Sequence, residues 1–113
     1  MPHCVIEYSI NLNDDSFRVE LMQAVYCATH SSELFDSGDI KVRAIPFAYY
    51  TAQNKEQGFV HVVLKILSGR TLKQRSLLSG LVLEKLENLS LLQVSLSVEV
   101  VEIERASYAK AIK

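Results

Sequence analysis

The chain has few of the residues that interrupt or cross-link a polypeptide. Its 113 residues include four Gly, two Pro and two Cys, and no Trp. Two cysteines are too few for a disulfide scaffold, and Cys4 and Cys27 lack metal-ligand spacing, so we expect both to be small core residues in a reducing compartment. The scarcity of Gly and Pro, together with 49% hydrophobic residues, excludes a disordered or low-complexity chain.

The sequence also has little net charge and no long apolar run. Twelve basic and thirteen acidic residues give a net charge of -1, so there is no positive field to attract nucleic acid or an anionic membrane. No apolar stretch approaches the roughly 18 residues of a membrane span, and the start Met-Pro-His-Cys lacks the pattern of a secretory signal. We therefore expect a cytoplasmic protein of one domain, residues 1–113, with neither nucleic acid nor membrane as a partner.

Alternation of apolar and polar residues, the pattern of a β-strand with one buried face, occurs in four segments. The predicted strands are 4–10, 40–50, 59–66 and 93–103, with a polar turn at 52–58. Pro46 predicts an edge position or a bulge for the second strand. The third strand is apolar on both faces, which predicts burial on both sides. The alternation changes phase between Val100 and Val101, which predicts a bulge in the fourth strand.

Apolar residues at three- and four-residue steps predict two helices. One follows the capping run 11–16 and fades near Ser31. The other begins after Thr71, whose spacing to Gln74 is that of a capping box.

The order strand-helix-strand therefore occurs twice, with the two halves offset by about 55 to 57 residues. This predicts an α/β (α+β) fold in which duplicated β-α-β units form a four-stranded mixed sheet with both helices on one face. The other face carries Val5, Phe59 and Val63 and has no cover within the chain. We expect another subunit to cover it.

Pro2 carries the most distinctive chemistry. Initiator methionine is commonly removed before so small a residue, and its removal converts the nitrogen of Pro2 from a tertiary amide into a secondary amine. Burial near cations disfavours the protonated amine and lowers its pKa toward neutrality, where a general base contributes about 10² to 10⁴ in rate. Many proteins begin with Met-Pro, so Pro2 is a candidate only in combination with other groups.

Three cations are candidates for binding an anionic ligand. Arg70 follows the third strand and directly precedes the Thr71 cap, where free backbone N–H groups favour anions, so it is either a bidentate carboxylate clamp or a solvated arginine. Lys41 and Arg43 are two residues apart and share one face of the second strand. They either line the same cleft as Arg70 or lie on an exposed face.

The sequence gives no sign of a metal or cofactor. His3, His30 and His61 have no carboxylate at a ligand spacing, so we expect no metal, and we expect His61 to be a hydrogen-bonded interior or interface histidine. The segment 68–70 is too poor in glycine for a phosphate loop, and no Gly-x-Ser-x-Gly elbow is present. Nucleotide-binding and hydrolase classes are therefore disfavoured.

Three segments resemble a known family when they are taken together and in order. They are Met-Pro-His-Cys-Val-Ile-Glu-Tyr-Ser at the start, Phe-Val-His-Val-Val-Leu-Lys-Ile at 59–66 and Gly-Arg-Thr-Leu-Lys-Gln-Arg at 69–75. The sequence is similar along nearly its whole length to 5-carboxymethyl-2-hydroxymuconate isomerase, of the tautomerase superfamily. The resemblance implies a tautomerase-like fold, assembly of identical chains as a trimer or hexamer, and a cofactor-independent keto-enol isomerase of aromatic compound catabolism.

The resemblance also implies roles for single residues. Pro2 would accept the enol proton of a 2-hydroxymuconate and return a proton to a distant carbon. Arg70 would bind a carboxylate of this small polycarboxylate substrate or polarise its 2-oxo group. Lys41 stands where the family has an arginine, and Arg43 keeps the next basic position.

Two alternatives remain open. One is a non-catalytic, oligomeric ligand-binding module of ferredoxin-like topology, in which Pro2 is incidental. The other keeps the proton transfer but acts on a different unsaturated hydroxy or oxo acid. A position of Pro2 near Arg70 favours the enzyme, whereas an open surface around Pro2 favours the module.

Overall fold

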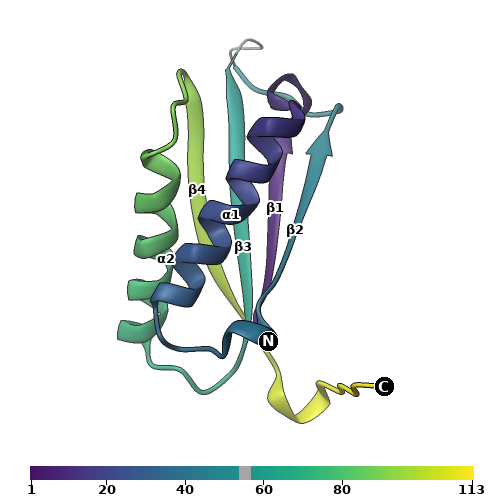
Figure 1. Ribbon diagram of the computed structural model, residues 1–113, viewed down its shortest axis with the longest axis vertical. Coiled ribbons are helices and arrows are strands. Elements are labelled where there is room, and N and C mark those ends of the chain that lie inside the picture. The colour runs from purple at the N-terminus through teal and green to yellow at the C-terminus, as the bar shows by residue number, and fades with distance from the viewer. Residues whose placement is uncertain (54–56) are drawn as a thin grey trace.

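The computed structural model describes residues 1–53 and 57–113 and contains the predicted strands and helices in the predicted order (Figure 1). The strands are β1 (His3–Ser9), β2 (Lys41–Phe47), β3 (Gly58–Leu67) and β4 (Val94–Ile103), and the helices are α1 (Asp15–Ser31) and α2 (Leu72–Glu87). Short 3-10 turns occur at Ile10–Leu12, Ser37–Asp39 and Arg105–Ser107. Part of the predicted turn at 52–58 lies outside the described residues.

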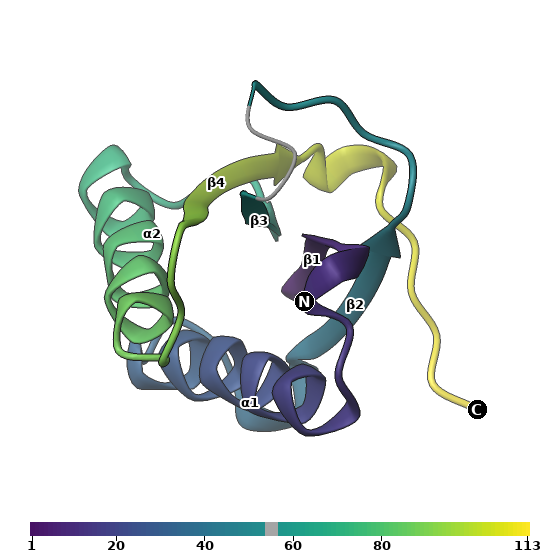
Figure 2. The same ribbon diagram turned by 90° about the horizontal axis from the view of Figure 1, so that it is seen from above.

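The strands form one mixed sheet in the order β2-β1-β3-β4. β1 is parallel to β2, β3 is parallel to β4, and the two pairs meet through the antiparallel neighbours β1 and β3. Both helices lie on the same side of the sheet (Figure 2). The predicted fold class is confirmed. β1 and β2 therefore begin at the end of the sheet at which β3 and β4 finish. We call this end, which runs across all four strands, the amino-terminal edge.

The hydrophobic core fills the space between the sheet and the two helices. Its fully buried side chains include Cys4, Ile6 and Tyr8 from β1, Val60, Val62, Leu64 and Ile66 from β3, Leu21 and Val25 from α1, and Leu78, Val82 and Leu86 from α2. Cys4 is in the core as predicted, but the prediction for Cys27 is wrong, because this residue is exposed on the outer side of α1. In the part of the chain described here, no helix is long and apolar enough to span a membrane.

The edge position predicted for the second strand is confirmed, since β2 pairs with β1 alone and Pro46 lies opposite Tyr8 within that pair. The bulge predicted in the fourth strand is wrong. β4 pairs with β3 residue for residue along its whole length. The change of phase therefore places Val101 on the face of the sheet that points away from the helices, where its side chain is 38% exposed.

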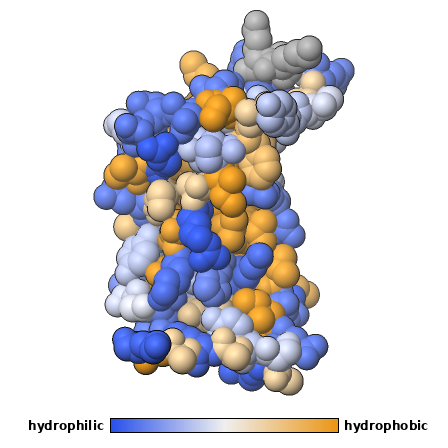
Figure 3. All heavy atoms as spheres, turned by 90° about the vertical axis from the view of Figure 1, so that its right-hand side faces the viewer, coloured by the Kyte–Doolittle hydropathy of each residue, from blue (hydrophilic) through white to orange (hydrophobic). Residues whose placement is uncertain are grey.

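That second face, which we call the open face, carries alternate residues of all four strands. Val5, Phe59 and Val63 on this face are half-buried, and Ile45 is 44% exposed. The prediction that β3 is buried on both sides is therefore wrong for the single chain, in which only its helix-facing side chains are fully covered. Seen from the side of β2, apolar side chains reach the surface in patches among hydrophilic ones (Figure 3).

The capping box at the start of α2 provides a test of the local structure. The hydroxyl of Thr71 accepts a hydrogen bond from the Gln74 N–H at 3.1 Å, and the Thr71 N–H donates to the Gln74 side chain at 2.9 Å. Thr71→Ala should lower the free energy of unfolding by about 1 kcal/mol, measured by urea denaturation. Thr51→Ala, which changes an exposed threonine outside the helices, should have an effect below about 0.5 kcal/mol. Equal losses for the two variants would contradict a stabilising cap.

Candidate active site

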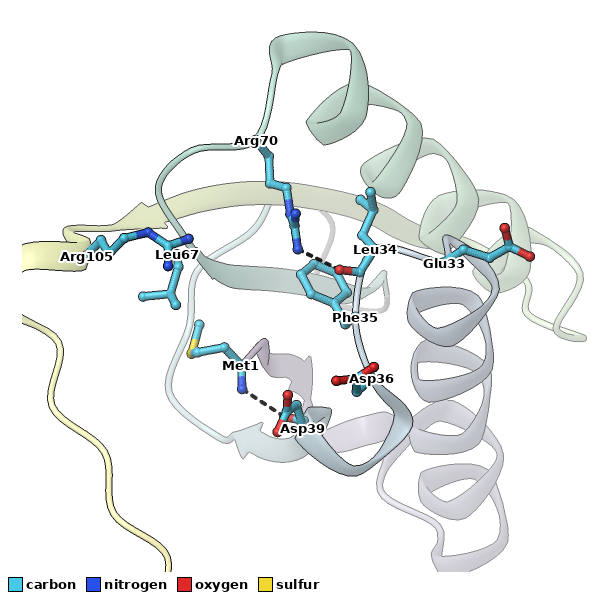
Figure 4. Close-up of a pocket in the computed structure, with 9 residues that line it drawn as sticks. All are labelled: Met1, Glu33, Leu34, Phe35, Asp36, Asp39, Leu67, Arg70 and Arg105. Carbon is cyan, nitrogen blue, oxygen red and sulfur yellow. Dashed lines mark hydrogen bonds between the residues drawn. The ribbon is translucent and has the colours of Figure 1, made fainter.

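Two cavities lie at the amino-terminal edge and share the first residue of the chain. The first has a volume of about 340 Å³ and is lined by Met1, Glu33, Leu34, Phe35, Asp36, Asp39, Leu67, Arg70 and Arg105 (Figure 4). The second has a volume of about 480 Å³ and is lined by Met1, His3, Gly38, Asp39, Lys41, Tyr108, Lys110, Ala111 and Ile112. Met1 and Asp39 belong to both linings, so Met1 lies where the two cavities adjoin.

Arg70 reaches the first cavity because the chain turns sharply between β3 and α2. Gly69 has φ +124°, a conformation that residues with a side chain rarely adopt, and Thr71 begins the helix. The Arg70 guanidinium donates a hydrogen bond to the Leu34 carbonyl at 2.6 Å and lies 5.4 Å from the centre of the Phe35 ring. These contacts hold the side chain at the cavity wall. A guanidinium has five N–H groups, so the Leu34 contact leaves donors for a carboxylate.

The sequence analysis did not identify Arg105, a second guanidinium in the first cavity. Its Nε and Nη2 donate to the Ser68 carbonyl at 3.2 and 3.1 Å, which connects the segment that follows β4 to the residue that follows β3. Because the two strands are parallel, the segments that follow them leave the sheet at the same edge. The signal was present in the sequence, since Arg105 follows the fourth strand as Arg70 follows the third.

Pro2 is buried, and its position is determined by main-chain contacts. Its carbonyl accepts a hydrogen bond from the Lys41 N–H at 3.1 Å, which aligns the starts of β1 and β2. The amine of Met1 donates to the Asp39 carbonyl at 3.1 Å. Burial, followed by the charges of Lys110 and Lys41, lowers the pKa of this amine, although the charge of Asp39 opposes the shift. The surroundings of the first residues thus disfavour a positively charged amine.

The two basic residues of β2 have different surroundings. Lys41 lines the second cavity, where its ammonium donates to the Gly38 carbonyl at 3.3 Å. Arg43 is not among the described residues that line either cavity, and its guanidinium lies 3.1 Å from Nδ1 of His3. The structure therefore brings Arg70 and Lys41 to cavities that share Met1, whereas Arg43 contacts a histidine. The direct ligand contact expected for Arg43 stays a prediction.

The C-terminal tail, residues 104–113, supplies part of the second cavity. Tyr108 hydrogen-bonds to Nε2 of His3 at 3.1 Å, and Lys110 forms an ion pair with Asp39 at 3.2 Å. This ion pair, as hydrogen bond and as charge, lowers the pKa of the Asp39 carboxyl. The sequence analysis did not identify the tail as part of a site, because its residues show no periodicity that assigns them to a helix or strand.

Residues 1–53 and 57–113 contain no cluster of three His, Cys, Asp or Glu side chains able to hold a metal ion. His61 lies on the open face, where its ring nitrogens contact Ser97 at 2.7 Å and Glu99 at 2.5 Å. It is hydrogen-bonded, as predicted, but it belongs to neither cavity.

A four-stranded mixed sheet with two helices on one side is the fold of the tautomerases. A sequence model of the 5-carboxymethyl-2-hydroxymuconate isomerase family matches residues 2–112, and the chain belongs to this family of isomerases. No curated protein matched the chain.

Several solved structures have the same fold as this chain. A 5-carboxymethyl-2-hydroxymuconate delta-isomerase has 21% identity and a TM-score of 0.82, with 98% of this chain and 88% of that chain covered. A 5-carboxymethyl-2-hydroxymuconate isomerase from Deinococcus radiodurans R1 has 24% identity and a TM-score of 0.77, with 99% of this chain and 90% of that chain covered. A structure described as a Q0 fused 4-OT wild-type symmetric trimer has 13% identity and a TM-score of 0.80, with 96% and 91% covered.

Substitution of Gly69, with Gly80 as a control, tests the conformation of the turn that carries Arg70. Gly69→Ala should lower the free energy of unfolding by about 1 to 2 kcal/mol, because its φ of +124° strains any residue with a Cβ. Gly80→Ala is the matched control on the exposed side of α2, where an added Cβ meets no atom within 4 Å. It should raise the free energy of unfolding by about 0.5 to 1 kcal/mol. Thermal melts in which both variants shift the melting temperature in the same direction would contradict the requirement for glycine at position 69.

Proposed function

We propose that the protein is a cofactor-independent keto-enol isomerase in which the free amine of Pro2 transfers a proton on 5-carboxymethyl-2-hydroxymuconate or a similar unsaturated hydroxy acid. The observation that carries the proposal is that Met1, attached to the buried Pro2, lines the same cavity as Arg70 and Arg105. Membership of the isomerase family favours this reaction class over a non-catalytic binding module.

The reaction in this proposal moves one proton and one set of double bonds. The neutral Pro2 nitrogen accepts the proton of the enol hydroxyl, and the electrons of the O–H bond form the carbonyl. The conjugated double bonds shift, and a distant carbon takes a proton from the charged Pro2 amine, which returns the base to its neutral form. Arg70 stabilises the oxygen on which negative charge develops, or holds the neighbouring carboxylate.

Removal of Met1 is part of the proposal. With Met1 attached, the Pro2 nitrogen is a tertiary amide without useful basicity. Without Met1, the nitrogen becomes a terminal amine, and the space that Met1 occupies between the two cavities becomes available to a ligand. The burial and cations that lower the pKa of the Met1 amine act on the same region, which supports a neutral Pro2 base.

The charges around the cavities support an elongated ligand with carboxylates at both ends. Arg70 and Arg105 line the first cavity, and Lys41 lines the second. Three acidic residues also line the first cavity. Asp39 is paired with Lys110, the carboxylate of Glu33 points away from Met1 in Figure 4, and Asp36 is the remaining carboxylate beside these cations. This pattern fits a polycarboxylate dienol. The role that we propose for the reaction, cytoplasmic catabolism of aromatic compounds, rests on the family and not on the charges.

We propose that the active form is a homotrimer in which other copies of the chain cover the open face. On this face the described residues include half-buried Val5, Phe59 and Val63 together with exposed Ile45 and Val101. Burial of such apolar side chains between copies of the chain would stabilise an oligomer. The similarity in fold to a symmetric trimer supports three copies rather than two.

Replacement of the base is the first test of the reaction. Pro2→Ala should lower kcat on 5-carboxymethyl-2-hydroxymuconate by about 10² to 10⁴, because the ring-held secondary amine is lost. For the wild type, kcat/KM should rise with pH through the pKa of Pro2, since only the unprotonated amine accepts a proton. Mass spectrometry must show that Met1 is absent from both proteins. Equal rates for wild type and Pro2→Ala would exclude Pro2 from the mechanism.

Arg70→Lys tests the guanidinium while keeping the charge. A point charge cannot form the bidentate contact, so kcat/KM should fall by about 10- to 100-fold. Arg18→Lys is the control, because Arg18 lies on α1 in an exposed ion pair with Asp15 outside both cavities. It should leave kcat/KM unchanged. An Arg70→Lys protein with wild-type kinetics would show that a bidentate contact from the guanidinium plays no part in the reaction.

A further inference from the structure

A chain of three side chains connects β2, β1 and the C-terminal tail. Nη1 of Arg43 lies 3.1 Å from Nδ1 of His3, and Nε2 of His3 lies 3.1 Å from the hydroxyl oxygen of Tyr108. Arg43 and His3 are near one another because β1 and β2 are parallel neighbours, with His3 opposite Lys41 and Val5 opposite Arg43. Tyr108 arrives from more than a hundred residues away in sequence.

The chemistry of these groups determines the direction of each hydrogen bond. A guanidinium only donates, so Nδ1 of His3 must accept and carries no proton. The neutral imidazole then has its proton on Nε2, and this N–H donates to the oxygen of Tyr108. A phenol that accepts at its oxygen keeps its own O–H free to donate elsewhere. The arrangement thus requires a neutral His3 with one defined tautomer.

The surroundings of His3 favour the neutral ring. Burial, followed by the charge of Arg43, lowers the pKa of His3, and the N-terminus, Lys41 and Lys65 act in the same direction. A protonated His3 would place a second positive charge against the guanidinium of Arg43.

Tyr108 lines the second cavity together with His3, Met1 and Lys41. We propose that the hydroxyl of Tyr108 donates a hydrogen bond to a carboxylate of the ligand in this cavity, and that Arg43 and His3 are positioning residues that orient the hydroxyl. The ligand class is an unsaturated dicarboxylate or tricarboxylate, whose far carboxylate lies between Tyr108 and Lys41. This inference rests on the proposed function and deepens it, because it assigns a recognition group to the end of the ligand opposite Arg70.

The tautomer of His3 can be measured without any reaction. Long-range ¹H–¹⁵N spectra of the full-length chain, assigned with a His3→Gln variant, should show a protonated Nε2 and an unprotonated Nδ1. In Arg43→Met, which removes the donor at similar length, the two tautomers should become mixed. A wild-type His3 protonated on Nδ1, or a tautomer that Arg43→Met leaves unchanged, would overturn the inference.

The role of Tyr108 is tested by binding of cis,cis-muconate, an unreactive conjugated dicarboxylate. Tyr108→Phe should raise the Kd by about 10-fold, the magnitude of a lost hydrogen bond to a charged group. It should also raise KM for the isomerase substrate more than it lowers kcat. Tyr49→Phe is the matched control, because Tyr49 is 97% exposed, and it should leave both constants unchanged.

A double-mutant cycle separates positioning from general structural damage. Arg43→Met should weaken muconate binding in the wild type and have little further effect in Tyr108→Phe, because its action passes through the hydroxyl. Additive effects, or an unchanged Kd for Tyr108→Phe, would overturn the inference. The proposed function fails separately: it requires loss of turnover in Pro2→Ala, whatever the result for Tyr108.

Discussion

The antiparallel contact between β1 and β3 determines where the candidate active site forms. Each β-α-β unit alone has two parallel strands and a helix, and neither unit would bring the start of the chain to an arginine that follows a strand. The contact reverses one unit relative to the other, so β1 begins beside the end of β3. Pro2 consequently lies at the sheet edge at which the chain leads into Arg70 and Arg105. The remainder of the site depends on this one pairing.

The electrostatics of this edge serve two purposes at once. Burial, together with cations from the tail and β2, disfavours a protonated amine at the start of the chain. Cations of this kind also bind carboxylates, so a polyanionic ligand would compensate the positive charge that disfavours a protonated amine. Asp39 reduces the net positive charge at this place. Its carboxylate is paired with Lys110, and its carbonyl accepts a hydrogen bond from the terminal amine. The two cavities together are lined by four basic residues, Arg70, Arg105, Lys41 and Lys110, and three acidic ones, Glu33, Asp36 and Asp39, in a chain whose net charge is -1.

Side chains that share a face of one strand can still have different tasks. Lys41 and Arg43 both point to the open face of β2, yet Lys41 lies at the strand start beside Met1, whereas Arg43 lies one step further in, against His3. A separation of two residues along a strand is about 7 Å, which is more than the width of a carboxylate. Position along the strand therefore decides which cation borders the cavity.

Local signals in the sequence determined much of the fold. Period-2 and helical spacing, the capping box at Thr71 and the strand-edge proline Pro46 act through neighbouring residues, and the structure confirms them. The cap at Thr71 and the pattern of the second strand also located Arg70 and Lys41 as candidates, whereas the Met-Pro start located Pro2. Only the tertiary structure decided the regular register of β4, the exposure of Cys27, and the return of the tail that brings Tyr108 to the second cavity. These features depend on contacts between segments distant in sequence, and no short-range pattern encodes such contacts.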